Sequence, residues 1–282
     1  MKTLTSLVGI VARDESTYIE ECILHNLLVG FDKVVVGLHK CVDDTQEKIE
    51  CLQQRFPDKI EYFEVQRTKQ KHSLGWLWYQ EECYLEIYKR YKGKAEWMAC
   101  FDVDECYWDR NRRPVNELLG GLPEKVGQVQ IPWLVFGASN RVFSVPKEES
   151  RYRWFGHRSM HEHSIHTKPI VRLDALNTEI RSWWWCHFCD LCKSYQTIDV
   201  YENRIVEGGM VKCFNPPITE RNVLLAHYRT GSMEDYVARE KRCSERRTTR
   251  DIHDFFCQNA PYVDDRMMIY HEEMMRLKND SN

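Results

Sequence analysis

The chain has 282 residues, of which 43% are apolar and 29% are charged, and its formal net charge is -3. This length allows a substantial core, and the composition excludes a disordered or low-complexity polymer. The near balance of 40 basic and 43 acidic residues gives no electrostatic case for nucleic-acid binding, and no apolar run approaches the roughly 20 residues of a membrane span.

The first hundred residues alternate between strand and helix patterns. Short apolar runs predict strands at residues 4–12, 33–38, 60–65 and 97–101. Apolar residues at helical spacing predict three helices: from Ser16 or Thr17 to Val29, from Asp43 or Asp44 to Arg55, and over residues 73–91. This alternation is typical of a mainly parallel α/β sheet, in which ligands bind at the carboxyl ends of the strands.

The second part of the chain is less regular. A short helix is predicted over residues 115–119 and a strand over 128–136, whereas residues 140–220 are rich in Trp, Arg and His without clean periodicity. Two helices are predicted near the end, over residues 232–243 and 264–278. Because no internal repeat and no flexible linker interrupts the chain, we expect a single compact domain.

The amino-terminal residues 1–15 are expected to be a core strand and its following turn. Their apolar part is too short and interrupted for a secretion signal and runs directly into a helical pattern. Without such a signal, the 12 cysteines are expected to be buried thiols. The sequence therefore predicts a cytoplasmic protein, unless a leader or anchor was removed.

Two carboxylates follow the apolar strand at residues 97–101. Asp102 and Asp104 lie two positions apart, so their side chains share a face on an extended backbone. Paired oxygen ligands suit Mg²⁺ or Mn²⁺, particularly when phosphate oxygens complete the coordination shell. The alternative interpretation is a solvated acidic turn, and the position after a buried strand favours the metal site.

These patterns together resemble the nucleotide-diphospho-sugar glycosyltransferases of the GT-A fold, and they are most similar to the glycosyltransferase family 2-like and family 92-like group. The resemblance covers about residues 5–240. It rests on the following segments: 11–15 (VARDE), 23–32 (ILHNLLVGFD), 42–45 (VDDT), 97–105 (WMACFDVDE), 168–172 (KPIVR) and 226–232 (AHYRTGS).

The resemblance implies a single GT-A (Rossmann-like) domain over residues 1–282. Residues 1–110 would bind the nucleotide sugar, residues 111–245 would form the acceptor and catalytic part, and residues 246–282 would be a helical extension. The implied ligands of Mn²⁺ or Mg²⁺ are Asp102, Asp104 and His227. The implied contacts of the nucleoside-diphosphate sugar are Val11, Ala12, Arg13, Glu15, His39, Lys71, Asp102 and Arg229.

Two positions depart from the pattern of this group. Residues 38–41 read Leu-His-Lys-Cys where an acidic or Asn-rich turn is usual, and Asp14 stands where Asn is commoner. Nucleoside specificity is therefore expected to differ. His227 has a second interpretation, as a core histidine on the strand 223–226, and Lys69 and Lys71 have a second interpretation as exposed loop lysines.

The predicted reaction is metal-dependent, inverting transfer of a hexose or deoxyhexose to a hydroxyl acceptor on a glycan or glycoconjugate. Similar inverting enzymes place a carboxylate base at about the position of Asp190, with Glu148, Glu149 and Glu162 as alternatives. Two other function classes stay open: a catalytically silent nucleotide- or glycan-binding module, and a metal-dependent phosphoesterase.

Three further patterns have both a functional and a structural interpretation. Cys186, Cys189 and Cys192, with His187 between them, are spaced for zinc, but buried thiols are the commoner outcome. Tryptophans 133, 154 and 183–185 suit either a sugar face or core packing. The basic run over residues 239–250 is expected to be a solvated helix face.

Overall fold

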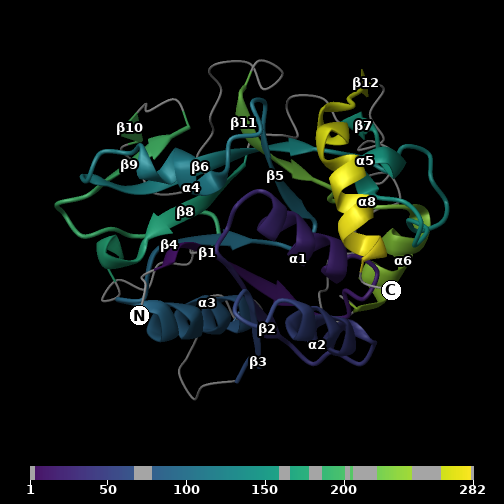
Figure 1. Cartoon of the computed structure of the whole chain (residues 1–282), viewed down its shortest axis with the longest axis horizontal. Helices are drawn as coiled ribbons and strands as arrows, with labels where there is room; N and C mark the ends of the chain where they lie inside the picture. The colour runs from purple at the N-terminus through teal and green to yellow at the C-terminus, as the bar shows by residue number, and fades with distance from the viewer. Residues whose placement is uncertain are drawn as a thin grey trace.

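The computed structural model describes residues 4–66, 78–158, 166–177, 186–200, 204–205, 221–242 and 262–280 (Figure 1). Its first part alternates strands and helices as predicted. The elements are β1 (Leu4–Ala12), α1 (Ile19–Leu28), β2 (Lys33–Leu38), α2 (Thr45–Arg55), β3 (Ile60–Glu64), α3 (Trp78–Tyr91) and β4 (Ala95–Phe101).

The second part of the chain adds mostly short elements. They are β5 (Glu105–Asp109), α4 (Val115–Gly120), β6 (Val126–Val135), α5 (Arg151–Trp154), β7 (His157–Arg158), β8 (Thr167–Arg172), η3 (Leu173–Ala175), β9 (Gln196–Asp199), β10 (Arg204–Ile205), β11 (Val223–His227), α6 (Met233–Arg242), β12 (Tyr262–Val263), η5 (Arg266–Tyr270) and α8 (His271–Asn279). Strand β5, directly after the acidic motif, was not expected from the sequence.

The sheet confirms the prediction of an α/β fold with a mainly parallel centre. Strands β4, β1, β2 and β3 lie side by side in this order, and all three pairings are parallel. Strand β8 is antiparallel to both β4 and β6, and β6 continues the sheet through parallel pairings with β9 and β11. Strand β5 is antiparallel to β11.

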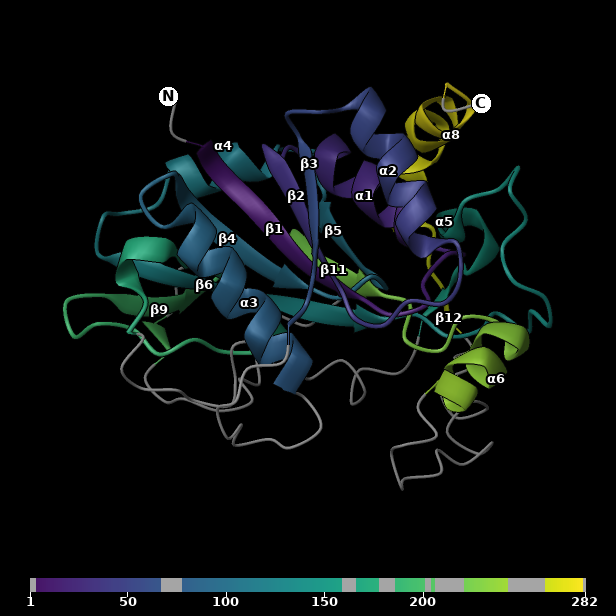
Figure 2. The ribbon, with the colours of Figure 1, turned by 90° about the horizontal axis from the view of Figure 1, so that it is seen from below.

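Helices cover both faces of the parallel strands because neighbouring strand residues point to opposite faces. In β1, Val8 and Ile10 join the core cluster that includes residues of α1 and α2, whereas Leu7 joins the cluster that includes α3. Figure 2 shows α3 on the opposite side of the strands from α1 and α2. The elements therefore form three layers, helix, sheet and helix.

Helix α3 packs very closely against the sheet. A Cβ atom at Gly37 on β2 would lie 2.3 Å from Sγ of Cys83 on α3, and one at Gly9 on β1 would lie 2.8 Å from Cδ1 of Ile87. At Gly37 only glycine leaves space for this approach. The contact fixes the helix whose first turn carries Tyr79 and Gln80, two residues that reach the candidate site.

Two predicted helices begin later than expected. Helix α1 begins at Ile19 because the amides of Tyr18 and Ile19 both donate to the carbonyl of Glu15, which forms a turn first. The predicted helix over residues 264–278 is a 3₁₀ helix, η5, followed by α8, and the Asp264 carboxylate accepts hydrogen bonds from Arg266 before η5. Residues 73–77 of the third predicted helix lie outside the described residues.

No helix in the described part of the chain combines the length and the apolar character that crossing a bilayer requires. The nine described cysteines are all free thiols. Five of them are buried as predicted, whereas Cys41, Cys186 and Cys192 are partly exposed and Cys51 is exposed, so the prediction of burial is wrong at these four positions.

Candidate active site

The acidic motif forms the tight turn between β4 and β5 at the carboxyl edge of the parallel strands. Strand β4 ends at Phe101, the amide of Glu105 donates to the carbonyl of Asp102 (3.1 Å), and β5 begins at Glu105. Because β5 is antiparallel to β11, Glu105 lies directly opposite His227, the last residue of β11. Residues more than 120 positions apart in the chain therefore meet at this edge.

Asp102 is held by a buried lysine that sequence reasoning did not assign to the site. Nζ of Lys168, on β8, lies 2.7 Å from Oδ2 of Asp102 and 3.5 Å from Oε2 of Glu105. The same Glu105 oxygen accepts the backbone amide of Asp102 (2.9 Å). Burial alone would lower the pKa of Lys168, but the two carboxylates raise it on balance, so Lys168 stays charged.

Asp104 is held by two different groups. Its Oδ1 lies 3.5 Å from Nε2 of His227, and its Oδ2 accepts a hydrogen bond from Nη2 of Arg239 on α6 (3.0 Å). Burial alone would raise the pKa of Asp104, but His227 and Arg239 lower it well below its usual range. Asp104 is therefore an anion in this site.

The interpretation of Arg239 as part of a solvated helix face is wrong. Its side chain is 22% exposed and turns inward onto Asp104. The basic run carried no signal for this contact, because the partner lies 135 residues earlier in the chain. For Lys168 the sequence did contain an indication of the contact. A lysine within a buried apolar strand needs a charged partner.

A cluster of aromatic rings lies beside the two carboxylates. The Trp133 ring, on β6, contacts the rings of His227 (4.2 Å between centroids), His166 (5.1 Å) and His187 (5.3 Å). Nδ1 of His187 lies 3.0 Å from the carbonyl oxygen of Thr167, the first residue of β8. Burial and the neighbouring Lys168 lower the pKa of His187 to about 4, so this ring is neutral at physiological pH.

A fully buried arginine holds the turn itself. Nη1 of Arg151, on α5, donates to the carbonyl of Val103 (3.0 Å), the residue between the two aspartates. Its Nε pairs with Glu21 on α1 (2.7 Å) and its Nη2 donates to the carbonyl of Tyr18 (3.1 Å). The side chains of Arg151 and Glu21 are 1% and 5% exposed. Arg151 thereby ties the acidic turn to the first helix.

Strands β1 and β2, which lead to predicted nucleotide contacts, end at the same edge. The carbonyl of Ala12 accepts the backbone amide of His39 (2.9 Å), and Val11 pairs with Gly37. The buried ring of His39 stacks on Tyr79 with 4.4 Å between centroids and 8° between planes. The ends of the two strands are thus joined to the first turn of α3.

The loops after β1 and β2 are also hydrogen-bonded to each other. The amide of Glu15 donates to Oγ1 of Thr45 (2.8 Å), and Arg13 directly precedes Asp14, which has a positive φ of 52°. Asp14, Cys41 and Asp43 form a group whose potential ligand atoms lie within 4.8 Å of one another. The carboxylates of Asp14 and Asp43 accept hydrogen bonds from these two loops. For example, the amide of Val42 donates to Asp14 (2.7 Å).

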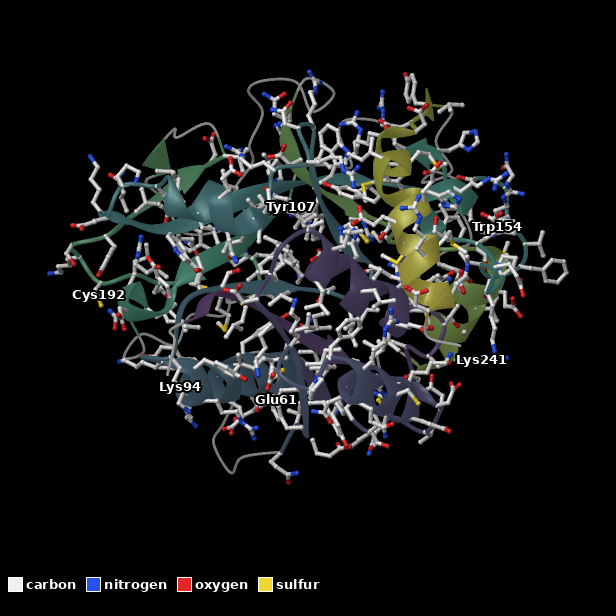
Figure 3. The ribbon with its side chains drawn as sticks, viewed as in Figure 1. Glu61, Lys94, Tyr107, Trp154, Cys192 and Lys241 are labelled. Carbon is white, nitrogen blue, oxygen red and sulfur yellow. The ribbon has the colours of Figure 1, made fainter. Side chains whose placement is uncertain are left out.

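Asp102, Asp104 and His227 do not form such a group of three among the described residues. Lys168 and Arg239 pair with the two carboxylates. The three cysteines 186, 189 and 192 do not form such a group either. Cys192 lies at the left edge of Figure 3 and Lys241, on α6, at its right.

The remaining predicted site residues lie in different places. The carbonyl of Arg229 accepts a hydrogen bond from Arg239, so Arg229 lies next to the acidic pair. The backbone carbonyl of Asp190 accepts the amide of Asn177 (2.9 Å), and its Oδ2 is buried. Glu149 pairs with Arg153 (3.2 Å). Lys69, Lys71, Glu162 and tryptophans 183–185 lie outside the described residues.

No protein-family model and no curated protein matches the chain. Among solved structures, the chain is similar to the mannosyltransferase PcManGT from Pyrobaculum calidifontis, in complex with GDP-Man and Mn²⁺. The identity is 19% over 46% of this chain and 36% of that chain, with a TM-score of 0.33.

Two further solved structures match over a longer stretch. One is glucosyl-3-phosphoglycerate synthase from Mycobacterium tuberculosis, in complex with Mn²⁺, UDP and phosphoglyceric acid: 15% identity, 61% of this chain, 57% of that chain and a TM-score of 0.32. The other is S. aureus TarS: 13% identity, 61% of this chain, 29% of that chain and a TM-score of 0.33. The chain thus spans less than two thirds of each of these proteins.

Proposed function

We propose that the protein is a metal-dependent, inverting glycosyltransferase that moves a hexose or deoxyhexose from a nucleoside diphosphate to a hydroxyl group of a glycan or glycoconjugate. The observation that carries the proposal is the position of Asp102 and Asp104. They form the turn at the carboxyl end of a buried parallel strand, which is where α/β sheets bind their ligands.

The donor atoms at this turn suit Mn²⁺ or Mg²⁺. Lys168 and Arg239 hold the Oδ2 atoms of the two aspartates, whereas Oδ1 of Asp102 accepts a long hydrogen bond from Gln80 (3.4 Å). Nδ1 of His227 is buried without a hydrogen-bond partner among the described residues. Asp102, Asp104 and His227 are therefore the proposed ligands. A bound divalent cation would neutralise charge on the departing diphosphate.

The nucleoside is proposed to lie along the end of β1. The backbone of Val11, Ala12 and Arg13 would face the base, with Glu15 supporting the loop and His39 at the end of β2. Support comes from the hydrogen bond that joins Ala12 to His39 and from the stacking of His39 on Tyr79, which together fix this edge. Lys71 and Arg229 are the proposed diphosphate contacts.

The acceptor hydroxyl must lose a proton while its oxygen attacks the anomeric carbon and the bond to the diphosphate breaks. We assign the proton to a carboxylate oxygen of Asp190, whose Oδ2 is buried without a partner among the described residues.

We also propose that the protein works in the cytoplasm. The nine described cysteines form no disulfide with one another, and free thiols are the rule in reducing compartments.

The proposal is tested with the purified chain in two stages. A thermal-shift screen with UDP-, GDP- and dTDP-sugars, with and without Mn²⁺, identifies the donor, because a ligand of the native state raises the unfolding temperature. Product analysis with that donor then separates the alternatives. Transfer to an acceptor with release of nucleoside diphosphate supports the proposal. Binding without turnover indicates a silent binding module, and release of sugar phosphate indicates a phosphoesterase.

A further inference from the structure

Helix α6 is fixed at its start to two other parts of the molecule. Oγ of Ser232 and Oδ2 of Asp235 are hydrogen-bonded (2.8 Å), and the same Asp235 oxygen accepts the hydroxyl of Tyr18 (2.5 Å). Oδ1 of Asp235 accepts the hydroxyl of Ser144 (2.6 Å). The start of α6 is therefore held to the loop before α1 and to the loop after β6.

One turn further along the same helix, Arg239 reaches the acidic motif. Its Nη2 donates to Oδ2 of Asp104 (3.0 Å), and its Nη1 donates to the carbonyl of Arg229. The side chains of Asp104 and Arg239 are 21% and 22% exposed, so water screens this pair less than a pair on the open surface. The guanidinium thus contacts a proposed metal ligand directly.

Both aspartates of the motif are neutralised by a side-chain cation of the protein. Lys168 pairs with Asp102, and Arg239 pairs with Asp104. The two cations differ in setting, because Lys168 is fully buried in β8 whereas Arg239 lies at the partly exposed end of a long side chain. A divalent ion on Asp104 would share that carboxylate with the guanidinium, and two cations at one carboxylate repel each other.

We propose that Arg239 competes with the divalent metal for Asp104, and that it transfers to the diphosphate when metal and nucleotide bind together. The inference rests on the proposed function. A guanidinium suits both partners, because its planar donors can pair with carboxylate oxygens and with phosphate oxygens. When the metal binds alone, Arg239 loses its contact with Asp104 and gains no other partner. When metal and nucleotide bind together, the diphosphate is a new anion with which Arg239 can pair. Metal and nucleotide therefore bind cooperatively, each strengthening the other.

The test compares Arg239→Gln with a matched control, Lys241→Gln, which removes an exposed cation from the same helix. Binding of Mn²⁺ alone is measured by electron paramagnetic resonance, and binding of UDP and of GDP is measured by calorimetry at saturating Mn²⁺. In Arg239→Gln we expect affinity for Mn²⁺ alone to rise by about fivefold or more, and nucleotide affinity to fall by a similar factor. Lys241→Gln is expected to change neither affinity.

The opposite signs distinguish competition from a structural role, since a variant that merely loosens the site loses affinity for both ligands. Arg239→Lys keeps the charge but loses the fork that spans Asp104 and the Arg229 carbonyl, so it should shift both affinities in the same directions by less. Unchanged Mn²⁺ affinity in Arg239→Gln, or a fall in both affinities, overturns the inference. If the wild-type protein binds no Mn²⁺ even with nucleotide, the proposed function itself fails.

Discussion

The two parts of this molecule differ in how their residues find their partners. In the part from β1 to β4, strands and helices follow each other regularly, and most partners are neighbouring elements in the chain. In the part after β4, short strands pair across long separations, as when Glu105 lies opposite His227. The first part builds the proposed ligand-binding edge, and the second part supplies Lys168, Arg239 and His227 to it.

The contrast shows why the acidic pair is placed by local structure but paired with distant residues. Asp102 and Asp104 emerge where β4 ends, which follows from the apolar run before them. Their charged and hydrogen-bonding partners arrive from β8, β11 and α6. A change in either part should therefore have a distinct effect, and the following variants separate the two.

The largest expected effect comes from breaking the link between the two parts. Replacing Arg151 by Ala leaves Glu21 buried without its partner and frees the carbonyl of Val103. Loss of one partner of a buried ion pair costs about 3–5 kcal/mol of unfolding free energy. Urea denaturation measures this loss. The variant Arg153→Ala, which removes an exposed arginine from the same helix α5, should stay within about 0.5 kcal/mol of wild type.

If Arg151→Ala is no less stable than Arg153→Ala, the two parts are not joined through this pair.

The second largest effect is expected on the rate of the reaction, from a substitution in the part of the chain after β4. Replacing Asp190 by Asn should lower kcat by about 10²-fold or more, because the acceptor proton then lacks its base. Donor binding, measured by calorimetry, should not change. Glu148→Gln removes an exposed carboxylate that was an alternative base and should leave kcat unchanged. A large loss of kcat in Glu148→Gln, with none in Asp190→Asn, would reverse the assignment.

A smaller effect is expected from pH, through a histidine at the junction of the two parts. Nε2 of His25, on α1, lies 2.8 Å from the carbonyl oxygen of Tyr107 on β5, and its Nδ1 lies 2.7 Å from the hydroxyl of Tyr152 on α5. Tyr107 is labelled near the centre of the molecule in Figure 3. Burial lowers the pKa of His25 to about 3 from an ordinary value of 6.5. This imidazole is therefore neutral in the folded protein at physiological pH.

The sign of the pH effect follows from where the proton binds. Below pH 6.5 His25 becomes protonated in the unfolded chain but stays neutral in the folded protein. Acid therefore favours unfolding. Between pH 6.5 and pH 5 the free energy of unfolding should fall by about 1.6 kcal/mol from this group. Denaturation at both pH values measures the loss, and His25→Gln should lose less. An equal loss in the variant would exclude His25 as its source.

The sequence predicted the first part well because its signals are local. The strand at residues 4–12 is predicted to the residue, and the strand before Asp102 is recognisable from its apolar run. The carboxylates could therefore be placed at a sheet edge. Strand β5 was missed because the residues directly after the acidic turn show no alternation: all five are buried.

The electrostatic setting of the site was largely beyond prediction. Arg239 looks like any residue of a basic helix, and only the folded chain brings it onto Asp104. Arg151 likewise reaches Glu21 across 130 positions. The predicted diphosphate contact Lys71 and the aromatic run 183–185 lie outside the described residues, so their roles stay predictions.

The most direct test of the account is the Mn²⁺-dependent rise in unfolding temperature that a nucleotide sugar produces, compared between wild type and Asp104→Asn. The substitution keeps the size of the side chain but removes the anion between His227 and Arg239. We predict that wild type is stabilised by its donor only when Mn²⁺ is present, and that Asp104→Asn loses this stabilisation and its turnover. Equal Mn²⁺-dependent stabilisation and turnover in the two proteins would contradict the central claim.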